Sequence, residues 1–128
     1  MFTTKDKEKL KSFLGAESEF QGELTDKGIL RIDGMVTGRV QADEVILSQT
    51  AVVKGDIVAR RIIVGGKVEG NLRASDLVEI KSKGKVKGEI VTDQLLVMEG
   101  GVFNGKIEMT ADEPHVTDFE QEIALQRP

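Results

Sequence analysis

Few residues of this chain could support catalysis or bind a metal. The 128 residues include no cysteine and one histidine, His115, which lies beside Pro114 near the C-terminus. The lack of cysteine excludes disulfides, cysteine-ligated zinc, iron–sulfur clusters and thiol catalysis, and the interior of the chain offers no imidazole for general-base chemistry. The glycine pairs Gly65-Gly66 and Gly100-Gly101 do not fit the G-x-x-x-x-G-K-[ST] spacing of a phosphate-binding loop. We therefore predict no catalytic residue, no cofactor and no metal, and a protein that is not an enzyme.

One interior segment contains regularly spaced charge, in the lysines Lys81, Lys83, Lys85 and Lys87. Because these lysines alternate with other residues, we expect all four to project from one face of the fourth-to-fifth turn of the predicted coil. Such a face could bind an anionic partner such as lipid or nucleic acid, or it could be a solvated edge that discourages sideways aggregation. The net charge of −4 argues against a general nucleic-acid binder, so we expect no specific nucleic acid as a partner.

The two ends of the chain differ in composition from its middle. Residues 1–14 have a net charge of +2, whereas residues 110–128 have a net charge of −4 and contain both prolines. A chain of this length, 39% hydrophobic and 31% charged, has room for one folded domain. We predict a single domain over residues 15–109, between a flexible N-terminal tail, 1–14, and a flexible acidic C-terminal tail, 110–128.

A sequence repeat fills the predicted domain. The pentad of an apolar residue, any residue, glycine, any residue and an apolar residue recurs six times, at spacings of 15 to 18 residues. Its glycines are Gly22, Gly38, Gly55, Gly70, Gly88 and Gly105. A small residue lies four positions before each of these glycines, and two adjacent apolar residues follow the first five glycines by seven and eight positions. Self-similarity on this scale is typical of a solenoid.

The repeat predicts an all-β fold. Alternation of period 2 inside the pentads indicates strands, and about 17 residues make one narrow coil whose neighbours stack about 4.8 Å apart. The predicted fold is a single-domain parallel β-helix with one coil for each of the six pentads. We expect a right-handed coil, because left-handed coils of this size usually repeat an apolar residue strictly every sixth position. The glycines would supply positive φ at corners or avoid a clash where two walls approach closely.

The candidate functional sites are the strand edges that such a coil exposes at its two ends. Phe20 lies in the first coil and Phe103 in the last, with no aromatic residue between them. Together with Leu24 and Ile107 of the same pentads, they either plug the lumen or dock on another molecule, extending the β-ladder from subunit to subunit. We predict a polymerisation interface at these four residues. The alternatives are a discrete, non-polymerising β-helix that binds a partner, and a catalytic site that forms only between chains.

Five motifs resemble those of the bactofilin family, over roughly three quarters of the chain: Phe13-Leu14-Gly15, Phe20-x-Gly22-x-Leu24, Leu30-Arg31-Ile32-Asp33-Gly34, Val68-Glu69-Gly70-Asn71-Leu72-Arg73-Ala74 and Val102-Phe103-x-Gly105. The resemblance implies a right-handed β-helix that assembles with itself, without nucleotide, into non-polar filaments joined head to head and tail to tail. It also implies a bacterial cytoskeletal scaffold at the inner face of the cytoplasmic membrane, which positions cell-wall enzymes or other morphogenetic proteins. The family's polymer contact near the last coil maps onto Phe103.

The N-terminal tail resembles the short membrane-targeting segment of many bactofilins. The residues concerned are Met1, Phe2, Lys5, Lys7 and Lys9. Because the chain has no apolar run of about 18 residues and no signal-peptide block, we expect a cytoplasmic protein, peripheral at the membrane. The alternatives are a solubilising tail, or a partial cap in which Leu10, Phe13 and Leu14 cover the first coil. The C-terminal tail is either solvated or contains a short docking motif.

Overall fold

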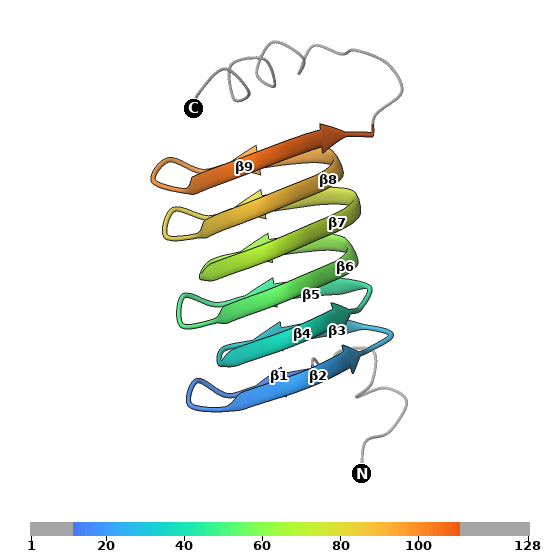
Figure 1. Cartoon of the computed structure of the whole chain (residues 1–128), viewed down its shortest axis with the longest axis vertical. Coiled ribbons are helices and arrows are strands. Elements are labelled where there is room, and N and C mark those ends of the chain that lie inside the picture. Colours follow the sequence, from blue (N-terminus) through green and yellow to red (C-terminus); the bar gives the residue numbers. More distant parts are fainter. Residues whose placement is uncertain (1–11, 111–128) are drawn as a thin grey trace.

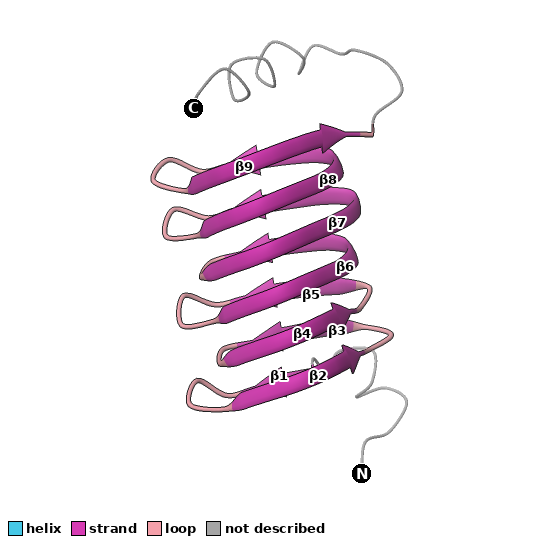
Figure 2. Cartoon of the chain, viewed as in Figure 1, coloured by secondary structure: helices cyan, strands magenta, loops and turns pink. Residues whose placement is uncertain are grey.

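A computed structural model describes residues 12–110 as one coil of stacked strands (Figure 1). Every helix or strand element within this range is a strand (Figure 2). The strands are β1 (Ser12–Leu14), β2 (Glu19–Thr25), β3 (Ile29–Ile32), β4 (Met35–Gln41), β5 (Glu44–Leu47), β6 (Val52–Val64), β7 (Lys67–Ile80), β8 (Lys85–Val97) and β9 (Val102–Met109). The predicted all-β class is confirmed.

Each turn of the coil passes through two walls built from parallel strand pairs. The first wall contains β2, β4, the first halves of β6, β7 and β8, and β9. The second contains β1, β3, β5 and the second halves of β6, β7 and β8. The near strands in Figure 1 rise from left to right toward the C-terminal end, which is the sense of a right-handed coil. The six pentads of the sequence are the strands of the first wall, so the predicted parallel β-helix is confirmed.

Consecutive coils come closest at the column of pentad glycines. These six glycines pair with one another in register from β2 to β9, with φ between 129° and 149°. A Cβ atom at Gly70 would overlap the carbonyl oxygen of Gly55 in the preceding coil. The expected positive φ is confirmed. The alternative expectation, that these glycines avoid a clash between opposite walls, is wrong at this column. A Cβ atom here would clash with the preceding coil of the same wall, which is stacked about 4.8 Å away along the axis.

Aliphatic side chains fill the lumen. Ile57 stacks on Leu72 and Ile62 stacks on Val78 in the next coil, and all four side chains are fully buried. Of the described residues, one polar side chain is buried, that of Thr92, and its hydroxyl donates a hydrogen bond to a backbone carbonyl at 3.1 Å. Since the interior is apolar and its buried hydroxyl is hydrogen-bonded, any functional site of the described coil lies on its outer faces or at its ends.

Two local expectations are corrected by the structure. The segment Ser12–Leu14, assigned to the N-terminal tail, forms strand β1, because its backbone pairs in parallel with β3. The alternation that predicted one face for the four lysines applies only to Lys85 and Lys87 of β8, since Lys81 and Lys83 lie in the turn between β7 and β8. The remaining residues of the two predicted tails, 1–11 and 111–128, lie outside the described residues.

The glycine column predicts a position-dependent cost of adding one methyl group. Gly70→Ala places a Cβ against the Gly55 carbonyl and forces alanine to a φ near 142°, so we expect a loss of at least about 2 kcal/mol in the free energy of unfolding. The matched control is Gly28→Ala, where the nearest atom is a carboxylate oxygen at 3.6 Å. Urea denaturation followed by circular dichroism measures both, and equal stabilities would contradict the stacking argument.

Candidate functional site at the ends of the coil

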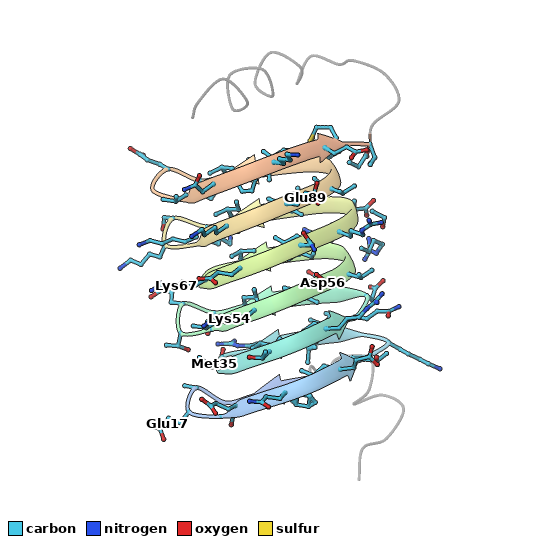
Figure 3. The ribbon with its side chains drawn as sticks, viewed as in Figure 1. Glu17, Met35, Lys54, Asp56, Lys67 and Glu89 are labelled. Carbon is cyan, nitrogen blue, oxygen red and sulfur yellow. The ribbon has the colours of Figure 1, made fainter. Side chains whose placement is uncertain are left out.

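The outer faces of the coil offer little that could catalyse a reaction. Residues 12–110 contain no group of three histidine, cysteine or acidic side chains that could hold a metal ion. A groove of about 440 Å³ lies beside the glycine column, and its lining includes Arg39, Asp56, Asn71 and Glu89. Asp56 and Glu89 are visible on this face in Figure 3. The Asn71 amide donates a hydrogen bond to the Asp56 carboxylate at 3.0 Å, so these two polar groups pair with each other across successive coils.

Among the described residues 12–110, the strands at the two ends of the coil have a neighbour on one side only. At the N-terminal end these are β1 and β2, and at the C-terminal end they are β9 and the second half of β8. Along such an edge the outward N–H and C=O groups have no partner within the coil. Another strand could therefore extend the ladder at either end, as it does between every pair of coils inside the molecule.

The C-terminal end also exposes apolar side chains. Within the described part of the chain, the large hydrophobic residues with the most exposure are Leu96 (48%), Val97 (39%), Met98 (41%) and Val102 (46%). They lie on the end of β8, the following turn and the start of β9. None of these four residues was expected from the sequence to be part of an interface. The signal was present in the fifth pair of adjacent apolar residues, Leu95-Leu96, which has no sixth pair after it to cover the exposed edge.

The four predicted interface residues occupy inward positions of the terminal strands. Phe20 and Leu24 pair in register with Val36 and Val40, and Phe103 and Ile107 pair with Val86 and Ile90. All four are half-buried and pack against the aliphatic core. They therefore close the lumen and still present part of their surface to the outside. Their role in polymerisation stays a prediction, and Met1, Phe2, Lys5, Lys7 and Lys9 lie outside the described residues.

An ion-pair ladder holds three successive coils together at one corner. The Arg60 guanidinium contacts the Asp43 carboxylate of the preceding coil at 3.3 Å and the Asp76 carboxylate of the following coil at 3.0 Å. Hydrogen bonds to Asp43 and then Asp76 raise the pKa of Arg60 above its ordinary value. Exposed pairs of this kind contribute modestly to stability. The three side chains link successive coils to one another, so we assign them a structural role.

Comparison with known proteins gives this stack of coils a family. Residues 12–108 match the bactofilin family, whose description is "Polymer-forming cytoskeletal". The chain belongs to the bactofilin family. As a bactofilin it is a polymer-forming cytoskeletal protein, and bactofilins are structural proteins rather than enzymes. The family resemblance of the five sequence motifs is confirmed, and a discrete coil that never polymerises is disfavoured.

Three related proteins show how far the similarity extends. Bactofilin BacO of Myxococcus xanthus is 32% identical over 101 residues, which are 78% of this chain and 80% of BacO. Bactofilin BacP of the same organism is 29% identical over 102 residues, which are 79% of this chain but 42% of BacP. The cryo-EM reconstruction of Thermus thermophilus bactofilin double helical filaments superposes with a TM-score of 0.68 at 28% identity, and covers 77% of this chain and 99% of that one.

The exposed apolar end predicts a substitution that weakens assembly without disturbing the coil. Val102 occupies an outward column that already contains Val52, Lys67 and Lys85 in earlier coils, so lysine fits this position in the fold. We expect Val102→Lys to raise the protein concentration needed for polymerisation severalfold, because it places charge at the terminal contact. Val52→Lys is the matched control in an interior coil. Light scattering against concentration measures both, and identical curves would argue against a contact at Val102.

Proposed function

We propose that this bactofilin is a scaffold that polymerises end to end, without nucleotide, into non-polar filaments joined head to head and tail to tail. The filaments position cell-wall or other morphogenetic proteins at the inner face of the cytoplasmic membrane. The observation that carries the proposal is the gathering of exposed apolar side chains on the last turn, next to an open strand edge. Backbone hydrogen bonds and apolar burial are sufficient for such a contact, so assembly needs no nucleotide.

The different chemistry of the two ends supports the non-polar arrangement. On the terminal strand β2, the outward positions include Glu19, Gln21 and Glu23, all of them exposed. A head-to-tail contact would place this polar edge against the apolar C-terminal end. A tail-to-tail contact instead covers Leu96 and Val102 with the same residues of a second copy, as a two-fold interface requires. Apolar surface is then removed from water on both partners.

The N-terminal segment supports a peripheral membrane location. Residues 12–110 contain no helix with the length and hydropathy needed to cross a bilayer. Insertion of Phe2 would contribute about 1.5 to 3 kcal/mol, and each of Lys5, Lys7 and Lys9 about 1 kcal/mol near an anionic leaflet. One subunit would therefore bind weakly. A filament presents many such segments at once, so multivalency strengthens the attachment.

The first test of the proposed function uses the wild-type chain and Phe103→Arg. We expect filaments of the wild type in negative-stain electron microscopy, in a buffer with chelator and no nucleotide. Phe103→Arg introduces a charge at the half-buried end of the lumen, so we expect loss of filaments with an unchanged β-sheet circular dichroism spectrum. Filaments that survive the substitution would show that Phe103 is not at the contact, and discrete particles in the wild type would refute end-to-end assembly.

The second test concerns the membrane. Deletion of residues 2–11 removes Phe2 and the N-terminal lysines, so we expect flotation with anionic vesicles to fall by about tenfold. Filaments should still form in solution, since the deleted residues precede β1. A variant with the same lysines replaced by glutamine and Phe2 retained separates the two contributions. Undiminished flotation of the deletion variant would rule out an N-terminal anchor.

A further inference from the structure

The outer surface of the first wall carries a cluster of positive charge that the end contacts do not use. We call it the lysine face, and it consists of Lys54, Lys67, Lys85 and Lys87. These side chains belong to the strand segments that precede the glycine column in β6, β7 and β8, and all four are exposed. Figure 3 shows Lys54 and Lys67 on the same side of neighbouring strands. Residues far apart in the sequence thus form one basic surface.

Like charges lie directly beside each other on the lysine face. Lys67 of β7 pairs in register with Lys85 of β8, and Glu69 lies between Lys54 and Lys87 in the adjacent column. Among the described residues, no carboxylate lies within 4.0 Å of any of the four ammonium groups. Cross-strand neighbours of like charge destabilise a sheet. The face therefore has a net charge of +3 that the coil does not neutralise.

Other outward columns of the coil balance their charges. Glu23, Arg39 and Asp56 follow one another in register in successive coils, and Arg60 lies between Asp43 and Asp76. The whole chain has a net charge of −4. The lysine face is thus a local exception on an acidic protein, and its chemistry is complementary to an anionic surface.

We propose that the lysine face binds an anionic lipid surface, so that the filament lies lengthwise on the membrane with this wall toward the headgroups. A flat sheet wall presents its lysines in one plane, and each lysine near an anionic leaflet strengthens binding about fivefold. The repeated presentation along a filament rests on the proposed end-to-end assembly. The outward positions of this wall contain no aromatic residue, which favours lipid over single-stranded nucleic acid, whose bases stack on aromatic side chains.

The test compares two triple variants of the full chain that change the net charge equally. The first replaces the lysine face by Lys67→Gln, Lys85→Gln and Lys87→Gln. The matched control replaces exposed basic residues outside the first wall, by Lys27→Gln, Arg31→Gln and Lys81→Gln. Flotation is measured with vesicles of phosphatidylcholine mixed with phosphatidylglycerol, and with vesicles of phosphatidylcholine alone. Flotation is used because filaments sediment without vesicles.

We expect the lysine-face variant to float at least about tenfold less than the wild type on anionic vesicles. The control variant should float like the wild type, and wild-type flotation should fall as salt is raised. The proposal is overturned if the lysine-face variant floats like the wild type, or if both variants lose binding equally. It is also overturned if the wild type does not bind the anionic vesicles, or if it binds them no better than vesicles of phosphatidylcholine alone. Loss of single-stranded RNA binding with vesicle binding intact would also overturn it.

The same samples separate this inference from the proposed function. Electron microscopy of each variant without vesicles reports on filament formation, which the lysine-face substitutions should leave intact because none of them lies on a terminal strand segment and β9 covers the part of β8 that contains Lys85 and Lys87. If the wild type forms no filaments, end-to-end assembly is refuted, while the comparison of the two triple variants still reports on the lysine face.

Discussion

The structure depends on one steric constraint, the contact between stacked glycines. At each step of the column, the carbonyl oxygen of one glycine occupies the space that a Cβ atom of the next would need. This contact fixes the register of each coil on the preceding one, so that every inward residue meets an inward residue and every outward residue an outward one. The aliphatic lumen, the ion-pair ladder at Arg60 and the lysine face are all consequences of that register.

Stacking of this kind pairs the backbone hydrogen-bonding groups of each coil with those of its neighbours. Within residues 12–110, the outward backbone groups of the first and last strands have no such partner. Inside the coil, every strand has a parallel partner above and below, whereas β2 and β9 each have one. A solenoid that works alone covers its ends with polar caps. Here the last turn instead exposes Leu96, Val97, Met98 and Val102. Exposed apolar surface of this kind is costly for a single molecule in water, and the chain belongs to a polymer-forming family.

The outer faces are free of the packing demands of the lumen, so their chemistry can vary from one column of residues to the next. On the first wall, one column places Arg39 between Glu23 and Asp56, and the neighbouring columns contain the lysine face. In a filament each subunit repeats these faces, so a weak property of one molecule becomes a strong property of the assembly. End contacts and side surfaces can therefore serve different partners.

The sequence by itself determined the repeat, the strand class, the parallel β-helix and the position of Phe20 and Phe103 at the two ends, because period and glycine spacing are local properties. Tertiary structure alone decided that the glycines crowd each other along the axis, that Ser12–Leu14 join the second wall, and that Lys67 lies beside Lys85. It also showed which apolar residues stay uncovered on the last turn. These features depend on which residues of different coils become neighbours, and the stacking register sets that only once the coil has closed.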